Sequence, residues 1–161
     1  MLSVQIICVG KLKERFYQEA AAEYAKRLSP YCRLSVLELA EQRLPADPSQ
    51  AQIDAALEQE GQMILAHLPA GAYTVALCVE GQLRSSPQLA ELVERCRQDG
   101  QRKHLAFLIG GSYGLAGSVK ERADLRLSIS PMTFPHHLAR VILLEQLYRA
   151  FKIGEGSAYH K

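Results

Sequence analysis

The sequence has no tryptophan, few aromatic residues (7%) and only four cysteines among its 161 residues. No two cysteines form a CxxC pair, which favours reduced structural thiols in a cytoplasmic protein over a disulfide framework. No run of 18 apolar residues occurs, so we expect no membrane span. The first residues lack a basic region and a small-residue cleavage site, so we expect no secretory signal.

The chain also has little net charge, since 19 Lys and Arg against 17 Asp and Glu leave +2 at pH 7. This balance argues against nucleic-acid binding by bulk charge alone. Basic side chains do gather locally, with six bases and three acids in residues 11–33 and four bases and one acid in residues 95–103. These two patches are either contacts for a polyanion or solvated faces.

The composition, 48% hydrophobic and 22% charged, is that of a folded protein, and the length predicts a single domain over residues 1–161. Five segments are dense in Val, Ile and Leu without polar alternation, as in strands that are covered on both faces. They are Val4–Val9, Leu34–Leu39, Tyr73–Val79, Leu105–Ile109 and Arg126–Ser130.

Helical patterns occupy the connections between these segments, over residues 12–28, 49–68, 86–100, 118–123 and 135–153. Ser49 and Gln52 fit a capping box at the start of the second helix. Gly61 inside that helix costs about 1 kcal/mol relative to alanine, with no evident reason in the sequence. The alternation predicts an α/β fold, a mostly parallel sheet with helices on both faces.

Three strand ends are unusual, and ligands bind beyond the carboxyl ends of strands in open α/β sheets. The first is the segment 79–81 and the second is the glycine cluster of residues 108–114, either a tight turn or a ligand loop. The third is the segment 130–137, which two prolines stiffen. It is either an ordinary connection or a site where the following helix start receives an anion or a polar group.

The last helix carries Arg140 near the middle of its apolar face. Because arginine is almost never buried alone, we expect Arg140 to pair with a carboxylate, contact a neighbouring subunit or reach a bound anion. The apolar sides of this helix also fit a homodimer contact.

His136 and His137 belong to no metal-binding motif, and no GxSxG hydrolase motif is present. The tail at residues 154–161 is either frayed or folded back over a site beside the glycine cluster.

Three C-terminal segments together carry a family resemblance. FLIGGSYGL (107–115), SPMTFPHHLARVILLEQLYRAFKI (130–153) and AYHK (158–161) resemble the ribosomal RNA large-subunit methyltransferase H family of the SPOUT class. The segments IICVGKLKERFYQEAAAEYAKRLSPY (6–31) and EGQMIL (60–65) fit the same pattern. The resemblance therefore extends over essentially the whole chain.

The resemblance implies a homodimer with a C-terminal trefoil knot. It further implies methyl transfer from S-adenosylmethionine to N3 of a pseudouridine in 23S rRNA on the assembled ribosome, with no metal and no membrane. The implied cofactor pocket maps onto the three strand ends described above. Its residues are Leu77, Gly110, Ile129, Ser130, Pro131, Met132, Thr133 and Phe134.

The catalytic group is less well defined by the resemblance than the cofactor pocket. Our candidates are His160 as base or proton relay and Tyr159 as a partner for the target base. Arg140 is a candidate for stabilising the imide charge or binding a phosphate.

Two alternative functions are also compatible with the sequence: a non-catalytic ribosome-associated or nucleotide-binding module of the same fold, and a structural dimer. Bound cofactor excludes the structural dimer, and methyl transfer to ribosomes excludes the non-catalytic module.

Overall fold

The computed structural model contains one five-stranded sheet in which every neighbouring pair is parallel. The strand order is β2-β1-β4-β3-β5. The bounds are β1 (Leu2–Val9), β2 (Cys32–Leu39), β3 (Tyr73–Leu83), β4 (His104–Ile109) and β5 (Leu125–Ser128). The structure describes residues 1–160, so Lys161, the last residue of the AYHK segment, lies outside the described residues.

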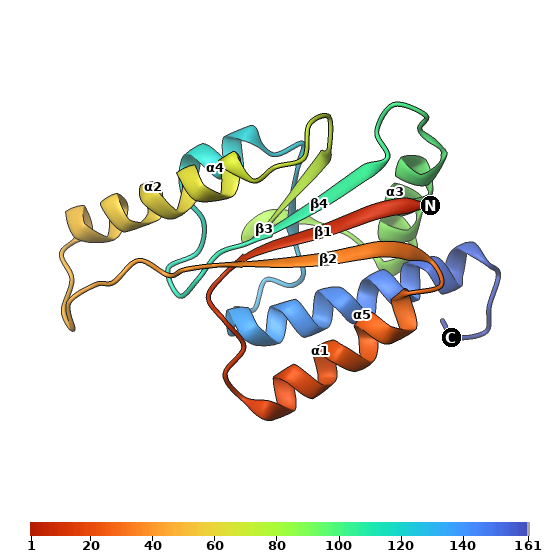
Figure 1. Cartoon of the computed structure of the whole chain (residues 1–161), viewed down its shortest axis with the longest axis horizontal. Helices are drawn as coiled ribbons and strands as arrows, with labels where there is room; N and C mark the ends of the chain where they lie inside the picture. The colour runs from red at the N-terminus through yellow and green to blue at the C-terminus, as the bar shows by residue number, and fades with distance from the viewer. Residues whose placement is uncertain (161) are drawn as a thin grey trace.

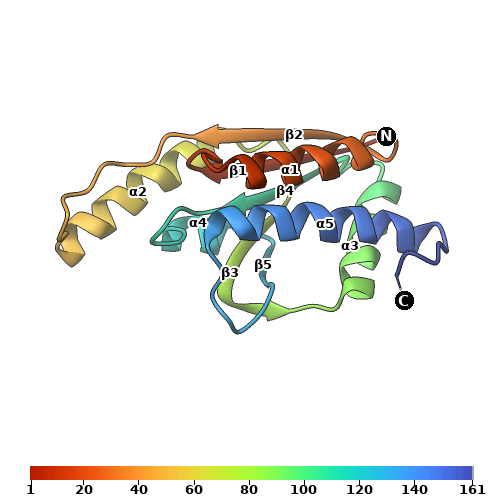
Figure 2. The same ribbon diagram turned by 90° about the horizontal axis from the view of Figure 1, so that it is seen from below.

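Among the described residues, five helices cover the two faces of the sheet (Figures 1 and 2). One face packs against α1 (Arg15–Leu28), α3 (Ser86–Gln98) and α5 (His136–Gly154), and α5 contacts both of its neighbours. The other face packs against α2 (Gln50–Ala66) and the short α4 (Gly117–Arg122). The predicted α/β class with helices on both faces is confirmed.

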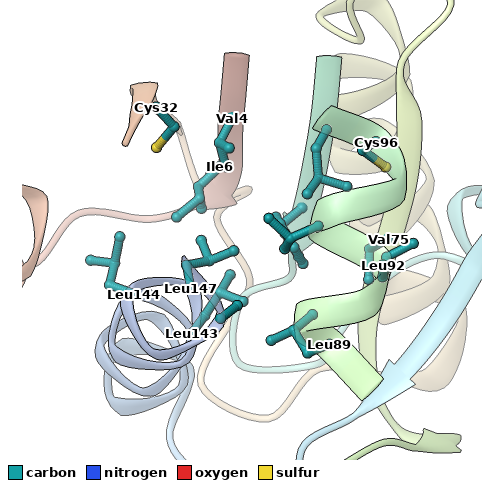
Figure 3. Packing of buried hydrophobic residues seen from close by; sticks show 14 of the residues in the cluster. Val4, Ile6, Cys32, Val75, Leu89, Leu92, Cys96, Leu143, Leu144 and Leu147 are labelled. Atoms are coloured by element: carbon teal, nitrogen blue, oxygen red, sulfur yellow. The ribbon is translucent and has the colours of Figure 1, made fainter. Parts of the chain in front are cut away.

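The core has two layers because alternate side chains of a strand point to opposite faces. In β1, Val4 and Ile6 belong to the layer under α1, α3 and α5, whereas Ile7 and Val9 belong to the layer under α2 and α4. Figure 3 shows side chains of α3 and α5 meeting the strands in the first layer. Each fully buried Leu or Ile contributes roughly 1.5–3 kcal/mol to folding, so these layers hold the strand ends in fixed positions.

Gly61 lets α2 approach α4 closely. A Cβ at this position would lie 3.1 Å from Ala116 Cβ and 3.1 Å from Val119 Cγ2. No reason for a glycine inside this helix was evident from the sequence, and the structure supplies one, because a larger residue would crowd the contact between α2 and α4.

The start of α2 agrees with the predicted capping chemistry, since Ser49 and Gln52 form the expected reciprocal capping box. Helix α3 begins at Ser86, where the sequence predicted its start, with Ser85 as its N-cap and Pro87 in its first turn. Strand β5 ends two residues earlier than predicted, which leaves Ile129 and Ser130 in the loop that follows.

No helix in the described part of the chain is both long and apolar enough to cross a membrane.

Candidate active site

A cavity of about 670 Å³ opens at the carboxyl ends of β4 and β5, beside the outer part of β3. Sites for small molecules and cofactors have volumes of about 300–1,000 Å³. Three segments form most of its wall: residues 77–80 of β3, residues 109–115 after β4, and the loop between β5 and α5. The three strand ends that the sequence singled out therefore meet at one site.

The first wall segment is a bulge in β3. The pairing of β3 with β5 is interrupted between Leu77 and Gln82, both of which lie opposite Leu127. The residues between them leave the ladder, and three of them line the cavity. A Cβ on Gly81 would lie 2.8 Å from the carbonyl carbon of Arg126, so glycine is needed where β3 returns to β5. The sequence predicted a strand end here, and the structure shows an interrupted strand instead.

The second wall segment is the glycine loop, residues 110–114, which closes tightly on itself. A Cβ on Gly110 would lie 2.2 Å from the carbonyl oxygen of Gly114. Gly114 has a φ of +83°, and its N–H donates to the carbonyl of Gly111 at 3.0 Å. The hydroxyl of Ser112 donates to Glu41 Oε1 at 3.3 Å. These contacts hold the loop backbone against the cavity, where its polar groups can approach a ligand.

The third wall segment is the loop of residues 129–135, which is tied down by its own serines. The hydroxyl of Ser128 donates to the carbonyl of Ser130 at 3.0 Å, and the N–H of Met132 donates to the hydroxyl of Ser130 at 3.0 Å. Pro135 is the N-cap of α5 and fixes the entry of the chain into that helix. The loop is therefore a stiff wall, although Met132 is 74% exposed at its rim.

The structure brings the predicted cofactor residues together. Leu77, Gly110, Ile129, Ser130, Met132, Thr133 and Phe134 line the cavity, whereas Pro131 is not among the lining residues. Lys120 and Glu80 also line the cavity, although the sequence did not indicate either of them as a site residue; Lys120 comes from α4 and its Nζ lies 2.5 Å from Glu80 Oε1. Nothing in the sequence pattern connects these two residues, because they are 40 positions apart.

Three titratable groups at the cavity have shifted pKa values, and burial raises the pKa of one of them, the Cys78 thiol. The hydrogen bond from Lys120 lowers the pKa of Glu80, so this carboxylate stays ionised. Burial lowers the pKa of His136, and the charges of His137 and Arg140 lower it further against the opposing effect of Glu41. The imidazole of His136 is therefore neutral at pH 7 and has a free lone pair.

Arg140 lies behind the cavity wall in a buried ion pair. It is 3% exposed, and its guanidinium donates to Glu38 Oε2 at 2.7 Å and to the carbonyl of Gly10 at 3.0 Å. Its Nε has no hydrogen-bond partner in the described part of the chain. The carboxylate of Glu38 also accepts the N–H of Leu12 at 3.2 Å. Of the three environments predicted for Arg140, the structure shows pairing with a carboxylate.

The C-terminal tail folds back onto the second half of α5. The hydroxyl of Tyr159 donates to Glu145 Oε1 at 3.3 Å, and the guanidinium carbon of Arg149 lies 4.9 Å from the centre of its ring. His160 Nδ1 lies 3.3 Å from Arg149 Nη1. At 1.5 Å per residue, Arg149 is about 20 Å along the helix from His136 at the cavity. The described part of the tail thus contacts α5 and lies at the opposite end of this helix from the glycine loop, not beside that loop (Figure 1).

Within residues 1–160, no three His, Cys, Asp or Glu side chains come close enough together to hold a metal ion.

The chain resembles known methyltransferases along nearly its whole length. A family model described as "Predicted SPOUT methyltransferase" matches residues 2–160. The chain is 47% identical over 160 residues to the ribosomal RNA large subunit methyltransferase H of Clostridium novyi (strain NT), an alignment that covers 99% of this chain and 100% of that protein. The proteins of the same name from Pelotomaculum thermopropionicum (47%, covering 99% of each chain) and Carboxydothermus hydrogenoformans (46%, covering 99% and 100%) are similarly close.

Proposed function

The chain belongs to the SPOUT methyltransferase family, and from that premise we propose that it methylates 23S rRNA with S-adenosylmethionine as the methyl donor. The target that we propose is N3 of a pseudouridine on the assembled ribosome, in the cytoplasm. The observation that carries this proposal is the convergence of the predicted cofactor residues on one cavity.

The chemistry of the cavity fits this cofactor. Leu77, Ile109 and Leu127 supply apolar surface for an adenine ring. The glycine loop and the loop of residues 129–135 bring backbone N–H and C=O groups to the wall, which suit the polar edges of adenine and ribose. When bound, S-adenosylmethionine supplies an electrophilic methyl group on a sulfonium sulfur. This chemistry needs no metal ion.

The protein's part in such a transfer is chiefly to position the reactants. Stiff loops hold the two reacting groups in line, and well-oriented reactants gain up to about 7–11 kcal/mol of the barrier. The imide nitrogen must also lose its proton at or before attack, so a proton acceptor near the cavity is required. We propose that Tyr159 stacks on the target base and that His160 acts as base or proton relay.

The position of the tail determines how these residues reach a site. Because Tyr159 and His160 lie at the far end of α5 from their own cavity, we propose that they act at the cavity of a second subunit in a homodimer. Exposed apolar side chains near the cavity support a subunit contact there, with Met132 at 74%, Leu83 at 60%, Tyr113 at 52% and Val79 at 45% exposure.

We propose that Arg140, being buried, acts on the imide charge from behind the cavity wall. The knotted backbone path stays a prediction.

The proposal is tested by transfer of a labelled methyl group. Purified protein is incubated with S-adenosylmethionine carrying a tritiated methyl group, together with ribosomes or with naked rRNA from cells that lack this activity. We expect label in 23S rRNA, far more with ribosomes than with naked rRNA, and recovery of 3-methylpseudouridine after digestion. Saturable cofactor binding with no label in any rRNA would contradict catalysis and favour a non-catalytic module.

A further inference from the structure

His136 and Glu41 meet beside the cavity from two different elements. His136 comes from the first turn of α5 and lines the cavity, and Glu41 follows the end of β2. A Cβ on Gly10 would lie 3.7 Å from His136 Nε2 and 4.0 Å from Glu41 Oε2, so both polar groups lie over the end of β1. Glu41 is itself held by the hydroxyl of Ser112 in the glycine loop. An imidazole of the cavity lining and a carboxylate held by the glycine loop thus lie over the same strand end.

Titratable and charged side chains surround His136 from α5 itself, from the segment before α1 and from the segment after β2. On α5 itself, the ring of His137 lies 4.0 Å away between centroids and Arg140 follows one turn later. Before α1, Glu14 Oε2 lies 3.6 Å from His137 Nδ1, and after β2 stands Glu41. Burial and the Arg140 guanidinium favour the neutral form of the imidazole, whereas the carboxylate of Glu41 is placed to stabilise an imidazolium once it forms.

We infer that His136 accepts the proton of the substrate's imide nitrogen during methyl transfer. This inference rests on the proposed function. The N–H bond breaks and the proton goes to a ring nitrogen of His136. The electron pair left on nitrogen forms the new N–C bond to the methyl carbon. The bond between that carbon and sulfur breaks, and its electron pair stays on sulfur. The products are a methylated imide, a neutral thioether and an imidazolium.

His136 meets the requirements of this step better than His160. His136 lines the cavity that is proposed to hold the methyl donor. The Nδ1 of His160 instead faces the guanidinium of Arg149, a permanent donor that occupies its lone pair. We therefore assign the first proton transfer to His136 and leave to His160 the relay of that proton.

The first test needs no activity. Nuclear magnetic resonance titration of the histidine rings of the free protein measures the pKa of His136, with H136Q used to assign its signal. We expect a pKa below 6.5, the usual value for histidine, and a further decrease in E41Q because a favourable carboxylate is removed. A His136 ring that is fully protonated at pH 7 would overturn the inference.

The second test is the pH dependence of methyl transfer to ribosomes. In the wild type, kcat/KM falls as pH decreases through the pKa of His136 and is level above it. We expect H136Q to lose about 100-fold or more in rate at saturating S-adenosylmethionine and to show no plateau, because only spontaneously ionised imide then reacts. H137Q is the matched control: it changes the neighbouring histidine and is expected to keep the plateau and the rate.

The outcomes of these tests distinguish a failure of the proposed function from a failure of the inference about His136. A wild-type enzyme that labels no rRNA contradicts the proposed function, and the ring titration then still reports the state of His136. A wild-type enzyme that labels 23S rRNA, with H136Q retaining both the rate and the plateau, overturns the inference alone. Loss of the plateau in H160Q instead of in H136Q would also overturn the inference. A thermal unfolding curve of H136Q that matches the wild type shows that a lost rate is not a lost fold.

Discussion

At the residue scale, Gly110 is the position where the glycine loop tolerates a side chain least, since its Cβ would meet the Gly114 carbonyl at 2.2 Å. We predict that G110A loses about 1–3 kcal/mol of unfolding free energy through forced backbone movement and loses binding of S-adenosylmethionine. Urea denaturation and calorimetry measure the two effects. G117A is the control, because nothing lies within 4 Å of its Cβ position; equal effects of both substitutions would contradict this account.

Arg140 is the second residue on which the site depends, because it joins Glu38 and the carbonyl of Gly10 to α5. We predict that R140M lowers the unfolding free energy by about 3 kcal/mol, since removing one partner leaves a carboxylate and a carbonyl without their donor. R15M removes an ion pair whose side chains are 90% and 64% exposed and is expected to cost less than about 1 kcal/mol. Similar urea midpoints for R140M and R15M would contradict the structural role.

The same ion pair predicts a pH dependence. Burial tends to raise the pKa of Glu38, but the hydrogen bond from Arg140, the N–H of Leu12 and the charges of Arg140 and Lys11 outweigh it and lower the pKa below 4.5. The unfolded state therefore binds the proton more tightly, and the stabilisation present above pH 4.5 is lost as pH falls through the native value. We expect urea midpoints to decrease below pH 4.5 in the wild type and to decrease less steeply in R140M.

At the scale of elements, the two capping boxes show where local sequence determines structure. Ser49 and Ser85 each accept an N–H three residues later, and each is paired with a glutamine that reaches back. We predict that S49A and S85A each lower the unfolding free energy by about 1 kcal/mol. S3A provides a control outside any helix start. Urea denaturation measures the effect, and urea midpoints that are unchanged in both S49A and S85A would show that packing alone positions these helices.

Much of the element structure could be predicted from sequence, since five apolar segments and the helical spacing between them correspond to the strands and helices observed. What local patterns could not predict were contacts between distant segments. The bulge of β3 depends on its pairing with Leu127, and the Lys120–Glu80 pair depends on the position of α4. The three strand ends were identified from their glycines and prolines, but their meeting at one cavity follows from the strand order.

At the scale of the whole molecule, the separation of tail and cavity along α5 predicts a site shared between subunits. Mixed dimers of a G110A subunit and a subunit truncated before Tyr159 test this. Each parent is expected to be inactive, and the mixture to recover about a quarter of wild-type transfer, because half of the dimers contain one complete site of two. An inactive mixture whose mixed dimers are verified by mass spectrometry would contradict a shared site.

The central claim, that this cavity holds S-adenosylmethionine, is tested most directly by calorimetric titration of the protein with that cofactor. We predict saturable binding to the wild type and to G117A, and none to G110A. No binding by the folded wild type, or equal binding by wild type and G110A, would contradict the claim.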